Sequence, residues 1–190
     1  MNIIRLQAIH TLSFTVSQAA EALGLGEPSA KVALHRYVKS GFVMRLKRGV
    51  YILKDRWQNL GDSEKLVIAN QLQVPSYISL SSALAYYGVT TQVPQDYVES
   101  IALVRSRQLT VDSILFRYSK IQKKYFRDFV KQKNIFIAKP EKALLDALYL
   151  VSLGRYRLDL SAIDMGRLNR KELAKTAKIF PSRVLGMLPS

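Results

Sequence analysis

The segment from residue 27 to residue 53, EPSAKVALHRYVKSGFVMRLKRGVYIL, places the strongest constraint on the fold. Pro28 suits the first position of a helix, and Gly41 can adopt the left-handed conformation that ends one. Between them, apolar residues recur at helical spacing, namely Ala30, Ala33, Leu34, Tyr37 and Val38. The segment therefore predicts a helix that buries one face in a core.

The pattern changes after Gly41 from the helical period to a period of two. Two sets of residues alternate along this stretch, Phe42, Met44 and Leu46 in one and Val43, Arg45 and Lys47 in the other. A β-branched and aromatic run follows at 50–53. With Lys47, Arg48 and Gly49 at the turn, this part predicts a β-hairpin.

The residues before this segment predict another short helix. Thr15 is a good N-cap, and Gln18, three residues later, fits a capping box. The apolar face of this helix consists of Val16, Ala19, Ala20 and Leu23. Residues 24–26 then form a glycine-containing turn. Two short helices joined by such a turn and followed by a hairpin are typical of a winged helix-turn-helix.

The exposed face of the second helix carries the candidate contacts with nucleic acid. We expect this face to present Ser29, Lys31, Val32, His35, Arg36 and Lys39. Arg36 can pair with guanine and Val32 can contact a thymine methyl group, whereas the lysines are better suited to phosphates. The candidate contacts of the hairpin are Arg45, Lys47 and Arg48. The alternative is a charged, solvated surface.

The charge balance favours a polyanionic partner. The chain of 190 residues has 29 Lys and Arg against 14 Asp and Glu, a net charge of +15. Such a surface binds nucleic acid through release of counterions. With no Cys and two His, we expect no metal site and no cysteine nucleophile. Without a membrane-spanning or signal-peptide pattern, we expect a cytoplasmic protein.

The rest of the chain predicts a second domain. Polarity rises and periodicity lapses at 55–61, DRWQNLG, which we interpret as a linker. Helical patterns follow at 62–73, 79–87 and 140–153, and strand patterns at 77–78, 98–104, 113–118 and 135–138. The expected fold is α+β: a winged helix-turn-helix at 1–56, then an α/β domain at 62–190 with a small mixed sheet and flanking helices.

A second basic concentration lies between Arg105 and Lys142. It holds eleven cations against three acids, and aromatic residues lie among them: Phe116, Tyr118, Tyr125, Phe126 and Phe129. The densest part is Lys120, Lys123, Lys124 and Arg127. This mixture can extend a DNA contact or bind RNA by stacking on unpaired bases. The alternative is that the aromatic residues are core and the cations point to solvent.

No catalytic site is expected from the sequence. Asp96 and Glu99 lack a lysine at nuclease spacing, and the serines at 79, 81 and 82 lack a hydrolase motif. Glu141 fits the first turn of a helix, where the helix dipole favours an acid. Asp146 lies among apolar residues, so we expect it to be partly buried and paired, with an arginine of the sheet as a possible partner. No cofactor is expected.

The sequence resembles the AbiEi family, antitoxins and transcriptional regulators of type IV toxin-antitoxin (abortive infection) systems. In the N-terminal part the resemblance rests on residues 14–53, and in the C-terminal part on YISLSSALAYYGV and IAKPEKALLDALYL. It implies a repressor that binds promoter repeats of its own operon. It also implies an antitoxin that acts against a nucleotidyltransferase-like toxin without a stable complex. A stand-alone regulator and an RNA-binding module remain as alternatives.

Overall fold

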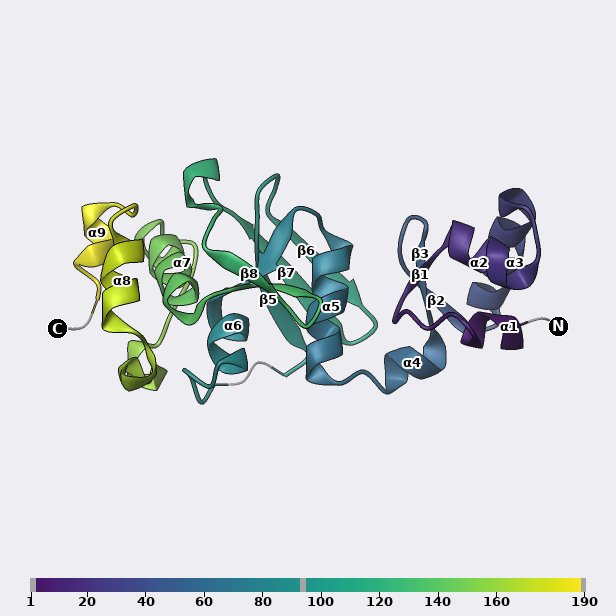
Figure 1. The fold of residues 1–190 in the computed structure, drawn as a ribbon, viewed down its shortest axis with the longest axis horizontal. Coiled ribbons are helices and arrows are strands. Elements are labelled where there is room, and N and C mark those ends of the chain that lie inside the picture. Colours follow the sequence, from purple (N-terminus) through teal and green to yellow (C-terminus); the bar gives the residue numbers. More distant parts are fainter. Residues whose placement is uncertain (1–2, 93–94, 189–190) are drawn as a thin grey trace. The chain divides into compact units, whose positions relative to one another are not determined.

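The structure is a computed structural model that describes residues 3–92 and 95–188. The chain divides into two compact units, Met1–Ile68 and Ala69–Ser190 (Figure 1). The division falls inside helix α5 (Asp62–Leu72). The domain limits drawn from the sequence, 1–56 and 62–190, stay a prediction, and their outermost residues lie outside the described ranges.

The first unit consists of short helices around a three-stranded sheet. Before α5 its elements are α1 (Ile4–Gln7), β1 (Phe14–Thr15), α2 (Val16–Leu23), α3 (Glu27–Lys39), β2 (Val43–Lys47), β3 (Val50–Leu53) and α4 (Lys54–Gln58). The sheet has the antiparallel order β1-β3-β2. The core of the unit lies between α1, α2, α3 and this sheet, and it contains the fully buried Leu6, Ala19, Ala30 and Leu34.

The start of α2 has the predicted capping box. The backbone N–H of Gln18 donates to the hydroxyl of Thr15 at 3.2 Å, and the Gln18 side chain accepts from the Thr15 N–H at 2.8 Å. Gly24 follows the helix with φ +68°. The turn to α3 is then only three residues long, as the sequence indicates.

The end of α3 depends on Gly41, which has φ +77°. The Gly41 N–H donates to the carbonyl of Val38 at 3.1 Å, and the Phe42 N–H donates to the carbonyl of Tyr37 at 3.0 Å. This pair of bonds is a Schellman motif, which satisfies carbonyls at the helix end. At the other end, Glu27 opens the helix, so Pro28 occupies the second position, one residue later than predicted.

The expected alternation in the hairpin is wrong. The register of β2 against β3 shifts between Arg45 and Lys47, so Leu46 is an extra residue in the strand. Such a bulge reverses the direction of the side chains that follow it. Val43 and Leu46 are therefore both buried, and Phe42, predicted to share a face with Leu46, is 45% exposed.

The segment at 55–61 is not a bare linker. Its first half belongs to α4, whose Trp57 is buried. The guanidinium of Arg56 donates to the backbone carbonyls of Thr11 at 2.6 Å and Gln7 at 2.9 Å. The high polarity of the segment concealed this helix, because its one large apolar side chain is too little to produce a periodic pattern.

The second unit contains a six-stranded mixed sheet with the order β6-β7-β5-β4-β9-β8. The strands are β4 (Ser76–Ile78), β5 (Tyr97–Ala102), β6 (Arg107–Val111), β7 (Ile114–Lys120), β8 (Phe129–Gln132) and β9 (Ile135–Ala138). The β5–β7 and β4–β9 pairs are parallel, and the others are antiparallel. The two edge strands, β6 and β8, were not predicted, because their polar sequences lack a buried face.

The helices of the second unit are α6 (Leu80–Tyr86), α7 (Pro140–Ser152), α8 (Arg170–Ala177) and α9 (Ser182–Leu185), in addition to the last turn of α5. Helix α7 packs against α6, α8, α9 and strand β9 (Figure 1). It is buried from Glu141 to Leu150 without interruption, so it forms the centre of this unit. The mixed helix-and-sheet fold class predicted from the sequence is confirmed. No described helix has the length and apolar character needed to cross a membrane.

Candidate nucleic-acid interface

Helix α3 separates its apolar and polar residues as predicted. Ala30 and Leu34 are completely buried, which fixes the rotation of the helix in the unit. The opposite face is exposed at all six predicted positions, namely Ser29, Lys31, Val32, His35, Arg36 and Lys39. Val32 is 53% exposed, although it is a β-branched apolar residue. An apolar side chain among cations on a helix face can contact the methyl group of thymine.

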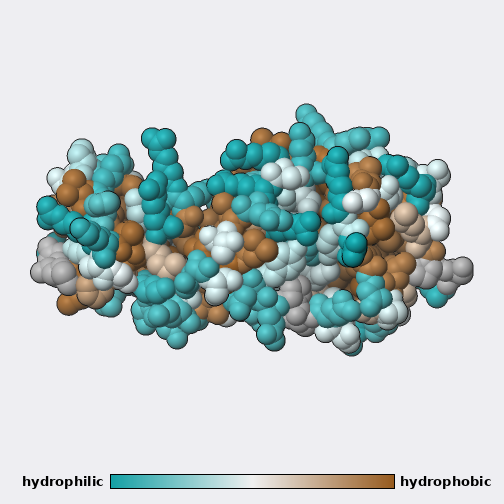
Figure 2. All heavy atoms as spheres, turned by 180° about the vertical axis from the view of Figure 1, so that it is seen from behind, coloured by the Kyte–Doolittle hydropathy of each residue, from teal (hydrophilic) through white to brown (hydrophobic). Residues whose placement is uncertain are grey.

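The cations of this face are available for an anionic ligand. Lys31 lies 3.8 Å from the carboxylate of Glu27, but both side chains are more than half exposed, so the pair is weak. Arg36 and Lys39 form no ion pair with another described residue. Figure 2 shows hydrophilic side chains projecting over most of one face of the chain, with hydrophobic patches between them.

The hairpin places cations at its tip. Arg45 and Arg48 are exposed, and Lys47 is half-buried. Gly49 has φ +78°, which allows the two-residue turn between β2 and β3. Phe42, which lies between α3 and β2, is an exposed aromatic residue next to this hairpin.

The second basic cluster consists of four exposed side chains, Lys120, Lys123, Lys124 and Arg127. Lys120 ends β7, and the next two lie in a short 3-10 helix. The ammonium of Lys124 lies 4.8 Å from the ring centre of Tyr125, and Arg127 pairs with Asp128 at 3.2 Å. The structure therefore brings these cations to one surface segment.

The aromatic residues interleaved with the cluster belong to the core or pack against it. Phe116, Tyr118 and Tyr125 are buried. The ring of Phe129 stacks on Tyr77 at 4.6 Å, and Phe126 packs against the same ring at 5.0 Å. The three buried rings have no free face for an unpaired base, which weakens the RNA-binding alternative.

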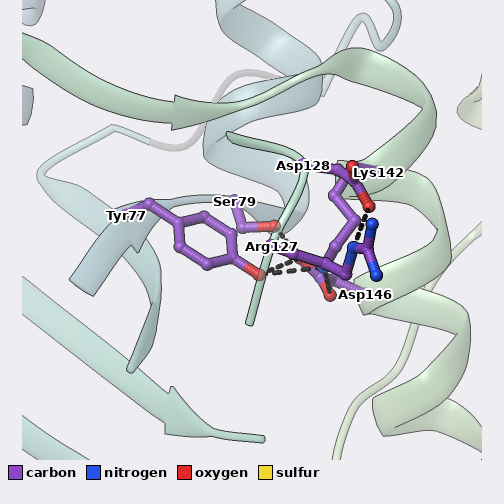
Figure 3. A network of polar contacts seen from close by, with 6 residues as sticks. All are labelled: Tyr77, Ser79, Arg127, Asp128, Lys142 and Asp146. Atoms are coloured by element: carbon purple, nitrogen blue, oxygen red, sulfur yellow. Dashed lines mark hydrogen bonds and ion pairs between the residues drawn. The ribbon is translucent and has the colours of Figure 1, made fainter. Parts of the chain in front are cut away.

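The expected partner of Asp146 is wrong. Asp146 is fully buried and pairs with Lys142, one turn earlier on α7, rather than with an arginine of the sheet (Figure 3). Its carboxylate also accepts from the hydroxyls of Tyr77 and Ser79, each at 2.9 Å. Lys142 was counted with the basic concentration, but it is 1% exposed and does not contribute to that surface.

Burial determines the acid-base properties of this network. It raises the pKa of Asp146 and lowers the pKa of Lys142, and the attraction between the two groups opposes both shifts. Burial likewise raises the pKa of the Tyr77 hydroxyl, which accepts from the Lys142 ammonium at 2.9 Å. The Tyr77 hydroxyl bonds to both charged groups of α7, so the buried network joins α7 to β4.

Glu141 lies in the first turn of α7, as expected from its preference for a helix N-terminus. It is buried, and its carboxylate also accepts from the backbone N–H of Asn169 at 2.8 Å. Glu141 therefore connects α7 to the start of α8.

A cluster of residues on and beside β5 was not predicted from the sequence. It includes Glu99 and the tripeptide Arg155, Tyr156 and Arg157, which follows the end of α7. Its members come from distant segments, so no spacing rule relates them. The local signal is the GRYR sequence at 154–157, which places two arginines around a tyrosine directly after the helix predicted at 140–153.

Comparisons with known proteins give a family match within the first unit and a similar fold for nearly all of the chain. Residues 13–54 match the family model described as "Transcriptional regulator, AbiEi antitoxin". No curated protein matches the chain. The crystal structure of the RV2827C protein from Mycobacterium tuberculosis is similar in fold, with a TM-score of 0.63 and 10% identity, over 96% of this chain and 71% of that one. The family match confirms the AbiEi resemblance for residues 13–54, the segment that contains the helix-turn-helix and the hairpin.

Proposed function

We propose that the protein is a sequence-specific transcriptional repressor that binds duplex DNA through α3 and the β2–β3 hairpin. The observation that carries this proposal is the exposed face of α3, where Val32 and Arg36 lie between cations while the opposite face is buried. A helix of this kind fits the major groove, where base edges present distinct donors and acceptors. The family match over residues 13–54 supports the same function.

In this proposal the exposed residues of α3 form two stripes, one that contacts bases and one that contacts phosphates. Ser29, Val32 and Arg36 follow one another at helical spacing and form the stripe nearest the bases. Lys31, His35 and Lys39 form the neighbouring stripe, in which the two lysines face the phosphates and His35 is a polar residue of the groove or surface. Arg45, Lys47 and Arg48 lie around the tip of the β2–β3 hairpin, and there they bind the phosphate backbone of the DNA.

The proposed DNA-binding domain comprises residues 1–56, and the proposed antitoxin or regulatory domain comprises residues 62–190. We propose that the protein acts in the cytoplasm, represses its own operon at promoter repeats and counteracts a nucleotidyltransferase-like toxin without a stable complex. The antitoxin role is supported by the family description. The nature of the toxin follows from the sequence resemblance alone.

The cluster of Lys120, Lys123, Lys124 and Arg127 is proposed as a second contact with nucleic acid. Like charges this close in the sequence repel each other, so an anion that binds all four lowers their energy. Since the neighbouring aromatic rings are largely buried, this contact would depend on charge rather than on stacking of bases.

The experiment that tests the function measures binding of the full chain to the duplex upstream of its own gene, by fluorescence anisotropy, at several salt concentrations. If the protein neutralises six to ten phosphates, affinity falls by about 10³ to 10⁵ between 50 and 200 mM salt. The same titration with a base-shuffled duplex measures specificity. Equal affinity for both duplexes would rule out a sequence-specific repressor.

A further inference from the structure

The second unit has a polar cleft with a volume of about 630 Å³ beside strands β5 and β7. This volume is in the range of sites that bind small molecules and cofactors. Two tyrosines, Tyr97 and Tyr156, and three arginines, Arg117, Arg155 and Arg157, line it around the carboxylate of Glu99.

The sheet positions half of this cleft. Tyr97 and Glu99 are two residues apart on β5, so their side chains are on the same face of the sheet. Arg117 on β7 is the register partner of Glu99 in the parallel β5–β7 pair. The guanidinium of Arg117 donates to the hydroxyl of Tyr97 at 3.2 Å. The strand pairing therefore fixes the position of one arginine at the wall of the cleft.

The end of α7 positions the other half. Gly154 has φ +68°, and its N–H donates to the carbonyl of Val151 at 2.8 Å. The Arg155 N–H donates to the carbonyl of Leu150 at 2.9 Å, which completes a Schellman motif. This turn directs the chain out of the buried helix, so that the residues after Gly154 line the cleft.

Glu99 is held in place because both of its carboxylate oxygens accept hydrogen bonds from the protein. The side chain is 1% exposed. It accepts from the hydroxyls of Tyr97 at 2.8 Å and Tyr156 at 2.7 Å, and from the Ser81 N–H at 3.2 Å. The Tyr156 hydroxyl uses its hydrogen in the bond to Glu99. The Ser81 hydroxyl is therefore the donor in its 2.7 Å contact with Tyr156. Glu99 thus orients both tyrosines and is not a free acceptor for a ligand.

The arginines give the cleft an excess of positive charge. Among the described residues, Arg155 and Arg157 form no ion pair, and both are exposed. The three guanidinium groups outnumber the single carboxylate of Glu99. Planar guanidinium groups bind phosphate through paired hydrogen bonds, so their presence favours a phosphorylated ligand over a neutral one.

An adjoining cleft extends this basic surface. It has a volume of about 320 Å³ and shares Arg117 and Arg155 with the first cleft. It adds the cationic side chains of Arg107 and Lys120. Arg117 and Arg155 therefore line both clefts.

We propose that the larger cleft binds a phosphorylated small molecule of nucleotide size, with its phosphates on Arg117, Arg155 and Arg157. The organic part lies beside Tyr97 and Tyr156. This site is separate from the α3 face, so it gives the second unit a ligand of its own whatever DNA the first unit binds.

Isothermal titration calorimetry with the full chain tests the proposal. The probes are the four ribonucleoside triphosphates, the corresponding monophosphates, pyrophosphate and inorganic phosphate. We expect saturable 1:1 binding of at least one nucleotide. The double variant Arg155→Gln/Arg157→Gln should weaken it at least tenfold. The matched control, Lys131→Gln/Lys133→Gln, removes the same charge from exposed positions outside the cleft and should change it less than twofold.

Several results would overturn the proposal. One is the absence of saturable binding for every probe. Another is an equal loss of nucleotide affinity in both double variants at an unchanged melting temperature, which would indicate only a diffuse electrostatic attraction. Binding of single-stranded oligonucleotides but of no mononucleotide would make the cleft part of a nucleic-acid interface. An Arg36→Ala variant separates the two functions, because it should lose DNA recognition and keep the nucleotide affinity of the parent.

Discussion

Lys142 and Asp146 lie one turn apart on α7 and form a completely buried ion pair, with the hydroxyls of Tyr77 and Ser79 bound to the same carboxylate. An ion pair of this kind is expensive to break, because the remaining charge is left without a partner in a medium of low polarity. The Tyr77 hydroxyl of β4 contacts both members of the pair, so the network connects α7 to β4.

We predict that Lys142→Met lowers the free energy of unfolding by about 3 to 5 kcal/mol, as measured by urea denaturation. The double variant Lys142→Met/Asp146→Leu removes both charges and should be more stable than Lys142→Met alone. If the loss in the double variant equals the sum of the losses in Lys142→Met and in Asp146→Leu, measured singly, the residues do not interact in the folded protein.

Glu99 should make stability depend on pH. Burial raises its folded pKa above the ordinary 4.5, so the folded state holds a proton that the unfolded state releases. Its contribution is fully present below about pH 4.5 and is lost as the pH rises through the folded pKa. The free energy of unfolding of the parent minus that of Glu99→Gln should therefore decrease with rising pH. An increase would mean that the hydrogen bonds to Glu99 outweigh its burial.

The capping box of α2 gives a smaller effect. Thr15→Ala removes the hydroxyl that accepts from Gln18 and should cost about 1 kcal/mol of stability. Thr15→Ser keeps the oxygen and serves as the control, with a loss of at most a few tenths of a kcal/mol expected. Thermal denaturation of the two variants measures the difference, and equal melting temperatures would show that the cap contributes nothing.

The basic cluster should affect function more than folding. Replacement of Lys120, Lys123, Lys124 and Arg127 by Gln should leave stability within about 0.5 kcal/mol per site, because these side chains are exposed. Operator binding or protection from the toxin should weaken. A variant that melts, binds and protects like the parent would show that the cluster is only a solvated surface.

The sequence predicted best where local chemistry determines the structure. Thr15 and Gln18 at the start of α2, and Gly41 at the end of α3, depend on neighbours within a few residues. The bulge at Leu46 could not be predicted, because it depends on the pairing of two strands. Helix α4 was not predicted because Trp57 is its one large apolar side chain, which is too little to produce a periodic pattern.

The sites of the second unit show the same limit. Asp146, which was expected to be partly buried, is fully buried. Its cation, Lys142, lies at the end of the stretch that composition alone indicated as a basic surface. The cleft around Glu99 was not predicted because the parallel pairing of β5 with β7 brings Arg117 opposite it. Such pairing over long sequence separations leaves no local pattern.

The central claim is that Arg36 on α3 reads a base, and the binding of Arg36→Ala to the operator and to a base-shuffled duplex tests it most directly. Lys178→Ala, an equal loss of charge on the exposed surface of the second unit, is the control. We predict that Arg36→Ala costs about 1 to 3 kcal/mol on the operator and much less on the shuffled duplex. Equal losses on both duplexes would contradict base recognition and reduce Arg36 to a phosphate contact.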